Sequence, residues 1–185
     1  MIKKFLDLGM QPLANKYLTK KDIIKKNKEQ FYHLEVGFNS KTKLVSIVNT
    51  VPSKKMFDGN YPYMSSMSQT MILSFKKLAK NLIKTYNPNS ILEIGSNDGP
   101  FIRNFSKKKV ICVEPCKNLA IITKRMGYKT YVSFWNMGLA KKIKSKTEKV
   151  ELIYSANTLS HINDLNSVFR SIAYILSDDG ILIIE

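Results

Sequence analysis

Cysteine, arginine and long apolar runs are scarce in this 185-residue sequence. There are only two cysteines, Cys112 within an apolar strand pattern and Cys116 just beyond it. A disulfide framework is therefore not indicated, and we expect reduced thiols. No apolar run approaches the roughly 20 residues of a membrane span, and Asp7 and Pro12 interrupt the N-terminal apolar residues that a secretory signal would need. We expect a cytoplasmic protein without a membrane partner.

Only three of the 30 basic residues are arginine, although the net charge is +16. A strongly basic chain can bind nucleic acid or an anionic membrane. Specific recognition of bases and phosphates favours the arginine fork, however, and dispersed lysine is typical of a solvated surface. We expect the lysines of 107–109 and 141–146 at helix ends or on polar faces. A nucleic-acid-binding protein therefore stays a distant alternative, and no nucleic-acid partner is expected.

The chain reads as two regions. With 44% hydrophobic residues it can bury one sizeable core and a small second one. Residues 1–60 contain short strand-like pieces, Phe31–Val36 and Leu44–Val48, and we interpret them as an accessory region. Residues 61–185 form the main domain. It opens on apolar residues at helical spacing between 66 and 86, with Ser66 or Ser68 as the N-cap.

Short apolar runs then alternate with helical stretches. The runs are Ile91–Ile94, Val110–Val113, Thr130–Val132, Leu152–Ser155 and Ile181–Ile184. This alternation predicts an α/β fold with a parallel sheet flanked by helices. The fifth run is followed only by Glu185, so we expect an open sheet edge that a partner chain or a second copy would cover.

Polar chemistry is concentrated where the first of these strands ends. The sequence Glu93-Ile-Gly-Ser-Asn-Asp-Gly99 leads into Pro100, which suits the first turn of a helix, so strand, tight loop and helix are expected in that order. Gly95 and Gly99 would let the backbone approach a ligand, and Asn97 tolerates a left-handed conformation. The dinucleotide fingerprint would require glycine at positions 97 and 100, so NAD is a poor match.

A second carboxylate is found at the end of the next strand. Glu114 follows the run at 110–113 and lies 19 residues after Gly95, close to the separation of about 20 expected for a ribose-binding acid. Its two oxygens can accept from both hydroxyls of a ribose. Alone, the loop fits an ordinary turn and Glu114 a solvated strand end. Together with Glu93 they favour a nucleoside-containing cofactor.

Five ordered motifs resemble those of one family. They are Phe5–Asn15, Tyr61–Ser68, Glu93–Gly99, Val113–Pro115 and Ala156–Ile162. The chain resembles the S-adenosylmethionine (SAM)-dependent sugar C-methyltransferases that act on nucleotide-linked keto-deoxysugars, over nearly its whole length. The resemblance implies a Rossmann-like class I methyltransferase fold, SAM as cofactor, a sugar nucleotide as small-molecule partner and an N-terminal zinc-binding module.

The resemblance also implies roles for individual residues. Glu93 would hold the methionyl ammonium of SAM, Glu114 the ribose, and Ser133 and Phe134 the adenine. The full set of expected cofactor-binding residues is Glu93, Gly95, Ser96, Asn97, Asp98, Gly99, Glu114, Ser133, Phe134, Ala156 and Asn157.

The expected catalytic residues are His161, Tyr63 and Tyr61. Tyr63 or Tyr61 would hydrogen-bond the acceptor, with aromatic packing as the alternative role. His161 would lie near the sulfonium and assist proton transfer, since its charge changes near neutral pH. The alternative is a surface or helix-capping histidine before Asp164.

Two departures from the family pattern are informative. The family's cysteine pairs, near the positions of Asp7–Gly9 and Gly37–Leu44, are missing here, although thiolates are what a structural zinc site requires. We expect zinc to be lost, His33 to be a packed or half-exposed residue, and residues 1–60 to be a degenerate remnant without a metal.

The second departure concerns the C-terminal part of the family pattern. The sequence stops after the fifth strand, before the family's later acceptor-site residues. We therefore expect a truncated methyltransferase domain that transfers methyl groups slowly or not at all by itself. A cofactor-binding remnant or subunit without independent turnover is the alternative.

Overall fold

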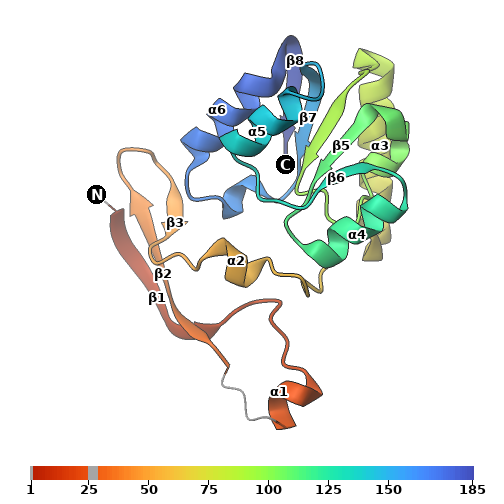
Figure 1. Ribbon diagram of the computed structural model, residues 1–185. Coiled ribbons are helices and arrows are strands. Elements are labelled where there is room, and N and C mark those ends of the chain that lie inside the picture. The colour runs from red at the N-terminus through yellow and green to blue at the C-terminus, as the bar shows by residue number, and fades with distance from the viewer. Residues whose placement is uncertain (1, 25–28) are drawn as a thin grey trace. The chain divides into compact units, whose positions relative to one another are not determined.

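A computed structural model describes residues 2–24 and 29–185, and in it the chain forms two units, Met1–Met56 and Phe57–Glu185 (Figure 1). The N-terminal unit contains a three-stranded antiparallel sheet in the order β1-β2-β3. Its elements are β1 (Ile2–Pro12), α1 (Lys20–Ile24), β2 (Phe31–Asn39), β3 (Val45–Ile47) and α2 (Ser53–Met56).

The strand β1 was not predicted, because its sequence does not keep the two-residue alternation of a regular strand. Two register shifts interrupt its pairing with β2, between Lys4 and Leu6 and between Asp7 and Met10. Gly9 lies in the second shift with φ of 66°, a conformation that favours glycine. The strands expected at 31–36 and 44–48 are present, and β2 extends three residues further than predicted.

The C-terminal unit is a five-stranded parallel sheet in the order β6-β5-β4-β7-β8. Its strands are β4 (Ile91–Ile94), β5 (Val110–Val113), β6 (Lys129–Tyr131), β7 (Val150–Ser155) and β8 (Leu176–Ile184). Its helices are α3 (Gln69–Tyr86), α4 (Lys117–Arg125), α5 (Met137–Lys144) and α6 (Leu165–Ile175). The predicted α/β fold with a flanked parallel sheet is therefore confirmed.

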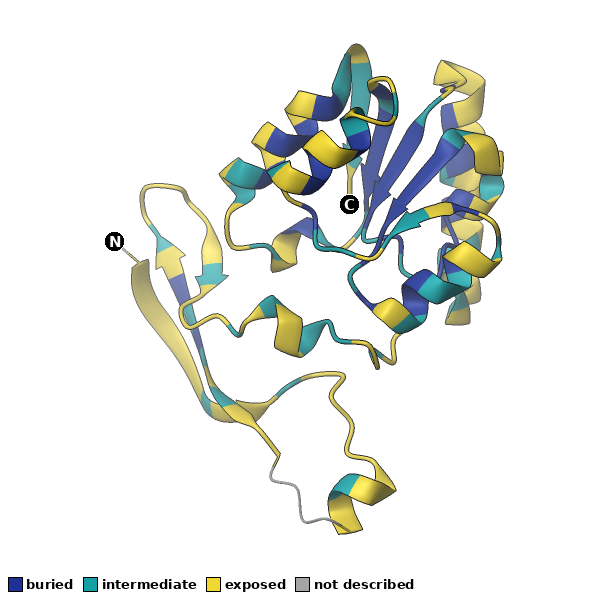
Figure 2. Cartoon of the chain, viewed as in Figure 1, coloured by how far each residue is buried: buried dark blue, intermediate teal, exposed yellow. Residues whose placement is uncertain are grey.

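The sheet divides the hydrophobic core into two parts. On one face, residues of α5 and α6 pack with strand residues such as Leu92 and Ile153, and on the other, residues of α3 pack with strand residues such as Ile91 and Tyr154. Every residue of β4 and β5 is buried, so the middle of the sheet is covered on both faces (Figure 2). Double burial explains why these strands read as continuous apolar runs.

The helix expected after the glycine loop is absent. Ile102–Asn104 forms only a single 3₁₀ turn. The Asn104 side-chain amide donates to the carbonyl oxygens of Pro100 (3.1 Å) and Phe101 (2.9 Å), which a continuing α-helix would pair with backbone N–H groups. The prediction of a helix that begins at Pro100 was therefore wrong.

The strand order indicates where a ligand would bind. The first strand of the parallel sheet along the chain, β4, lies between β5 and β7, so the connections leave β4 in opposite directions. In open α/β sheets, ligands bind at the carboxyl ends of the strands where this reversal occurs. The loop from Gly95 to Gly99 follows the carboxyl end of β4 and is therefore in the expected position. None of the helices in the described ranges has the length and apolar character needed to cross a membrane.

Candidate cofactor-binding site

The loop after β4 is fixed by backbone hydrogen bonds and by three left-handed residues. The N–H groups of Gly95 and Ser96 donate to the Val113 carbonyl at 2.8 and 3.2 Å, which ties the loop to β5. Gly95, Asn97 and Gly99 have φ of 76°, 49° and 83°. Glycine and asparagine are the residues that adopt this region most readily, which explains the sequence G-S-N-D-G.

The two glycines of the loop also pack closely against the protein. A Cβ atom on Gly95 would lie 2.1 Å from the Thr158 hydroxyl oxygen, and one on Gly99 would lie 3.0 Å from side-chain carbons of Ile102 and Thr123. The sequence suggested that these glycines let a ligand approach. In the structure, the space that their side chains would occupy is filled by the protein itself.

Glu93 is the most unusual polar residue of the site. It lies in β4 with 3% of its surface exposed, and its Oε2 atom has no hydrogen-bond partner among the residues that the structure describes. Burial first, and then the charges of Glu114 and Asp98, raise the pKa of Glu93 well above its ordinary value of 4.5. An unpartnered buried carboxylate is unfavourable, so this position is suited to a ligand that brings a cation or an N–H donor.

Glu114 is held by the backbone around it. Its two carboxylate oxygens accept hydrogen bonds from the N–H groups of Cys116 and Asn97, each at 2.8 Å. Burial raises the pKa of Glu114, and these two N–H groups oppose the rise. Each oxygen keeps a further lone pair, so ribose hydroxyls can still donate to it. Glu114 therefore shapes the loop in addition to the ribose-binding role expected from its position.

Asn97 and Asp98 direct their side chains toward the segment that precedes α3. Asn97 Oδ1 accepts from the N–H of Ser65 at 2.9 Å, and Asp98 Oδ1 accepts from the N–H of Ser66 at 3.1 Å. Asn97 Nδ2 donates to the Tyr63 carbonyl at 3.2 Å. These side chains were expected to contact the cofactor, but the hydrogen bonds that they form here are to the protein.

The remaining expected cofactor residues follow the carboxyl ends of neighbouring strands. Ser133 and Phe134 follow β6 and are half-buried, and the Ser133 hydroxyl donates to the Phe134 carbonyl. Ala156 and Asn157 follow β7, and Asn157 has φ of 48°. Ser96 in the glycine loop is 1% exposed. Because all of these strands are parallel, their carboxyl ends lie along the same edge of the sheet.

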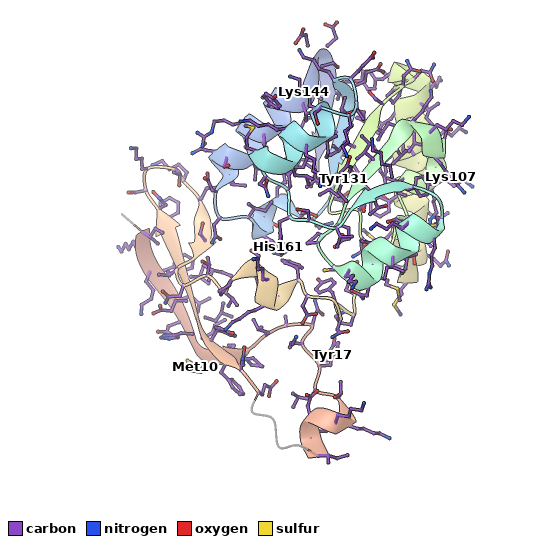
Figure 3. All side chains as sticks on the ribbon, in the orientation of Figure 1. Met10, Tyr17, Lys107, Tyr131, Lys144 and His161 are labelled. Atoms are coloured by element: carbon purple, nitrogen blue, oxygen red, sulfur yellow. The ribbon has the colours of Figure 1, made fainter. Side chains whose placement is uncertain are left out.

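The residues expected to act in catalysis lie around an aromatic contact that the sequence did not suggest. The ring of Phe57 lies 5.4 Å from the ring of Tyr61 and 5.6 Å from that of His161, measured between centroids. His161 is exposed in a 3₁₀ turn after β7 (Figure 3), and Tyr63 is 46% exposed. Phe57 has no motif of its own, and only its position just before Tyr61 could have suggested it.

The two cysteine thiols are free and buried. Burial raises the pKa of Cys112 to about 12, so this thiol is inert at neutral pH. The prediction of reduced thiols agrees with this arrangement. Neither cysteine offers a nucleophile for the chemistry of the site.

The N-terminal unit brings together one group of possible metal ligands among the residues that the structure describes. Ligand atoms of Asp7, His33 and Glu35 lie within 4.8 Å of one another. His33 Nε2 is 2.8 Å from Asp7 Oδ1, and Lys4 bonds both carboxylates. The Gly9 N–H and then His33 lower the pKa of Asp7 to about 2. Within the group, Lys4 and His33 therefore already bond the carboxylates. The loss of zinc stays a prediction.

Two protein-family models match this chain. A family model described as "Methyltransferase domain" matches residues 66–185, and one described as "Putative zinc binding domain" matches residues 1–57. The first match covers most of the chain. The chain belongs to this methyltransferase family. The resemblance found in the motifs is therefore confirmed at the level of both domains.

Individual relatives of this methyltransferase are distant. C-methyltransferase NovU of Streptomyces niveus is 23% identical over 185 residues, which cover 97% of this chain and 43% of NovU. A solved structure from Methanococcus maripaludis, described as a "putative s-adenosyl-l-methionine-dependent methyltransferase", is similar with a TM-score of 0.53 and 19% identity over 74% of this chain and 67% of that one.

A second solved structure supports the same fold. The plantazolicin methyltransferase BamL, solved with SAH and a substrate analogue, is similar with a TM-score of 0.50 and 16% identity. The match covers 64% of this chain and 47% of BamL. Together these structures establish the class I methyltransferase fold for the C-terminal unit.

Proposed function

We propose that this methyltransferase binds SAM at the carboxyl ends of β4 and β5 and transfers its methyl group to carbon. The observation that carries the proposal is the buried, unpartnered carboxylate oxygen of Glu93 at the reversal point of the sheet. The methionyl ammonium of SAM is a cationic N–H donor that would pair with this oxygen. The pyrophosphate of NAD would instead bring negative charge toward Glu93, Asp98 and Glu114.

The residues of the chain fit the other parts of SAM in chemical type. Glu114 offers lone pairs to the ribose hydroxyls, and Ser133 and Phe134 offer a polar group and a ring for the adenine. Ala156 and Asn157 follow β7 next to the glycine loop. When bound, SAM supplies an electrophilic methyl group on its sulfonium sulfur. Holding both reactants in reactive geometry supplies much of the rate enhancement in such a reaction, up to about 7 to 11 kcal/mol in the best models.

We further propose a nucleotide-linked keto-deoxysugar as the acceptor. The support for this finer step is the similarity to C-methyltransferase NovU, whose full length this chain covers only to 43%, together with the tyrosine motif at 61–63. A carbon beside a keto group becomes a nucleophile when a base removes its proton. A neutral His161 imidazole can accept that proton, and the Tyr61 or Tyr63 hydroxyl can donate to the keto oxygen. The new carbon–carbon bond forms as the methyl–sulfur bond breaks.

A cofactor-binding protein without turnover is the second candidate. The exposure of His161 and Tyr63 favours this candidate. In the part of the chain that the structure describes, these exposed side chains leave the proposed acceptor site open to water. Water reduces the advantage of orientation and weakens every electrostatic interaction in the site. The two candidates share the cofactor site and differ only in the transfer step.

Two measurements test the proposal in sequence. Calorimetry with SAM, with NADH as the comparison ligand, tests the cofactor site, and SAM binding without NADH binding is expected. Transfer of a labelled methyl group to a keto-deoxysugar nucleotide then tests the reaction. Absence of SAM binding would refute the whole proposal, whereas binding without transfer would support the second candidate.

A further inference from the structure

We propose that Asn97 is a positioning residue that fastens the tyrosine segment, residues 61–66, to the glycine loop, so that cofactor site and acceptor site are held in register. This inference rests on the proposed function for its catalytic consequence. It concerns the side chain of Asn97, which the sequence assigned to the cofactor itself.

The Asn97 side chain forms three hydrogen bonds to the protein. Its Oδ1 accepts from the N–H groups of Ser65 and Asp98, both at 2.9 Å, and its Nδ2 donates to the Tyr63 carbonyl at 3.2 Å. An amide provides, on two separate atoms, both the acceptor and the donor that these contacts need. Aspartate would keep the acceptor alone. Glycine would keep the left-handed backbone of φ 49° but lose all three bonds.

The same residue is also bonded to the proposed cofactor side of the loop. The backbone N–H of Asn97 donates to Glu114 Oε2 at 2.8 Å. Glu114 therefore bonds the main chain of Asn97, and the tyrosine segment bonds the side chain of the same residue. A change in how Glu114 is bonded is transmitted to Tyr63 and Ser65 through one residue.

The tyrosine segment has an irregular backbone, and side chains of the glycine loop and of α4 bond it. Residues 61–64 form neither helix nor strand, and 65–67 form a single 3₁₀ turn. Two other side chains from the same edge of the sheet bond it. Asp98 Oδ1 accepts from the N–H of Ser66 at 3.1 Å, and Asn118 Nδ2, in the first turn of α4, donates to the Tyr61 carbonyl at 2.7 Å. Among these three side chains, that of Asn97 bonds the segment at two residues, Tyr63 and Ser65.

Hydrogen exchange of the Ser65 amide in the full chain tests the inference directly. We expect Asn97→Gly to speed exchange at Ser65 by roughly three- to tenfold, the value of one lost hydrogen bond. Asn97→Asp should keep most of the protection at Ser65 but loosen the Tyr63 attachment. Asn104→Ala is the matched control, because the Asn104 side-chain amide donates to the Pro100 and Phe101 carbonyls of the adjacent turn. It should leave exchange at Ser65 unchanged.

Binding and kinetics then separate positioning from direct cofactor contact. Asn97→Gly should raise KM for the acceptor by at least fivefold and change the Kd for SAM by less than threefold. In the unsubstituted chain, SAM should further slow exchange at Ser65. If Asn97→Gly weakens SAM as much as Glu114→Ala does, Asn97 is a cofactor ligand and the inference is wrong.

Two outcomes of the exchange measurement complete the test. Unchanged exchange at Ser65 in Asn97→Gly would show that the amide does not fasten the segment. If that variant unfolds, Asn97→Asp decides, and equal KM values for it and the unsubstituted chain would overturn the role of the Tyr63 bond. Because exchange is measured without cofactor, a chain that fails to bind SAM would refute the proposed function while the fastening could still be observed.

Discussion

Replacing Glu93 by glutamine separates the structural cost of this residue from its proposed use. Glu93 is 3% exposed, its Oε2 atom has no hydrogen-bond partner within residues 2–24 and 29–185, and Asp98 and Glu114 add negative charge nearby. Glutamine keeps the shape and removes the charge. The substitution should therefore stabilise the protein without ligand and weaken its binding of SAM.

The stability gain follows from the charge that glutamine removes, because the glutamine amide remains a buried polar group. An unpaired buried polar group costs about 1–3 kcal/mol and a charge costs more, so Glu93→Gln should raise the free energy of unfolding by about 1–3 kcal/mol where Glu93 would be ionised. For a protein of this size the melting temperature would rise by roughly 2–10 °C. Glu148→Gln is the matched control, since Glu148 is exposed and its loss changes the net charge equally.

The gain should depend on pH in a defined direction. The pKa of Glu93 is higher in the folded state than in the unfolded state, so the folded protein holds this proton more tightly. The contribution of Glu93 to stability is present below the unfolded value of about 4.5 and is lost as pH rises through the raised pKa. The difference between Glu93→Gln and the unsubstituted chain should therefore vanish near pH 4.5 and be largest above the raised pKa.

Binding should change in the opposite direction. A hydrogen bond to a charged group contributes about 1.5–3 kcal/mol, so Glu93→Gln should weaken SAM binding by roughly ten- to a hundredfold. Because Glu93 must be ionised to pair with the ammonium, binding near the raised pKa should release a proton. Calorimetry in two buffers of different ionisation enthalpy measures that release. Unchanged affinity combined with an unchanged melting temperature at pH 8 would refute the reasoning.

Three further predictions follow from the loop and the N-terminal unit. Gly95→Ala should destabilise the protein by about 1–3 kcal/mol in chemical denaturation, because its Cβ would meet the Thr158 hydroxyl at 2.1 Å and φ is 76°; a loss below about 0.5 kcal/mol would contradict the packing. Glu114→Ala should weaken SAM binding at least tenfold in calorimetry, since ribose contacts and the bond to Asn97 are lost together; equal affinity would remove Glu114 from the site. Metal analysis of untagged protein should find less than one zinc per chain, and one tightly held zinc would show that the zinc site is retained.

The sequence predicted the middle of the sheet better than its edges. The bounds of β4 and β5 agree with the apolar runs at 91–94 and 110–113, because strands buried on both faces must be apolar throughout. At one edge, β6 begins one residue earlier than predicted. At the other, β8 begins at Leu176 and includes the polar residues Ser177 to Asp179, which a search for apolar runs omits. Edge strands carry less of the burial signal from which strands are predicted.

The candidate site was predictable in its carboxylates but not in its hydrogen bonds. Glu93 and Glu114 could be placed because Glu93 lies one residue before the end of β4, Glu114 directly follows β5, and the carboxyl ends of parallel strands share an edge. The bond from Asn97 to Tyr63 joins residues 34 positions apart, and no local pattern indicates such a contact. The packing of Thr158 on Gly95 has the same origin. Residue type and spacing therefore suggested a chemistry for the site, whereas the fold decided which partners each side chain meets.

The affinity for SAM should depend on salt, because the protein is basic whereas its proposed site is acidic. Residues 57–185 contain 18 basic and 10 acidic side chains, yet Glu93, Asp98 and Glu114 are all buried at one loop. Exposed lysines repel SAM, a ligand of net charge +1 at neutral pH, and salt screens them within about 8–10 Å. The buried carboxylates are screened much less. Salt should therefore remove repulsion and leave the attraction of the site.

The expected change in SAM affinity with salt is small, but its direction distinguishes SAM from anionic ligands. A net charge of +8 spread over a body of roughly 18 Å radius gives about 0.5 kcal/mol less repulsion at 0.15 M than at 0.01 M salt, so SAM affinity should rise roughly two- to threefold. An anionic sugar nucleotide should show the opposite sign. A nucleic-acid ligand would lose affinity by several orders of magnitude over a similar range, because each phosphate contact releases counterions. Titrations of SAM at both salt concentrations measure the difference, and a SAM affinity that falls steeply with salt would show that exposed, screened charges, not the buried carboxylates, hold the ligand.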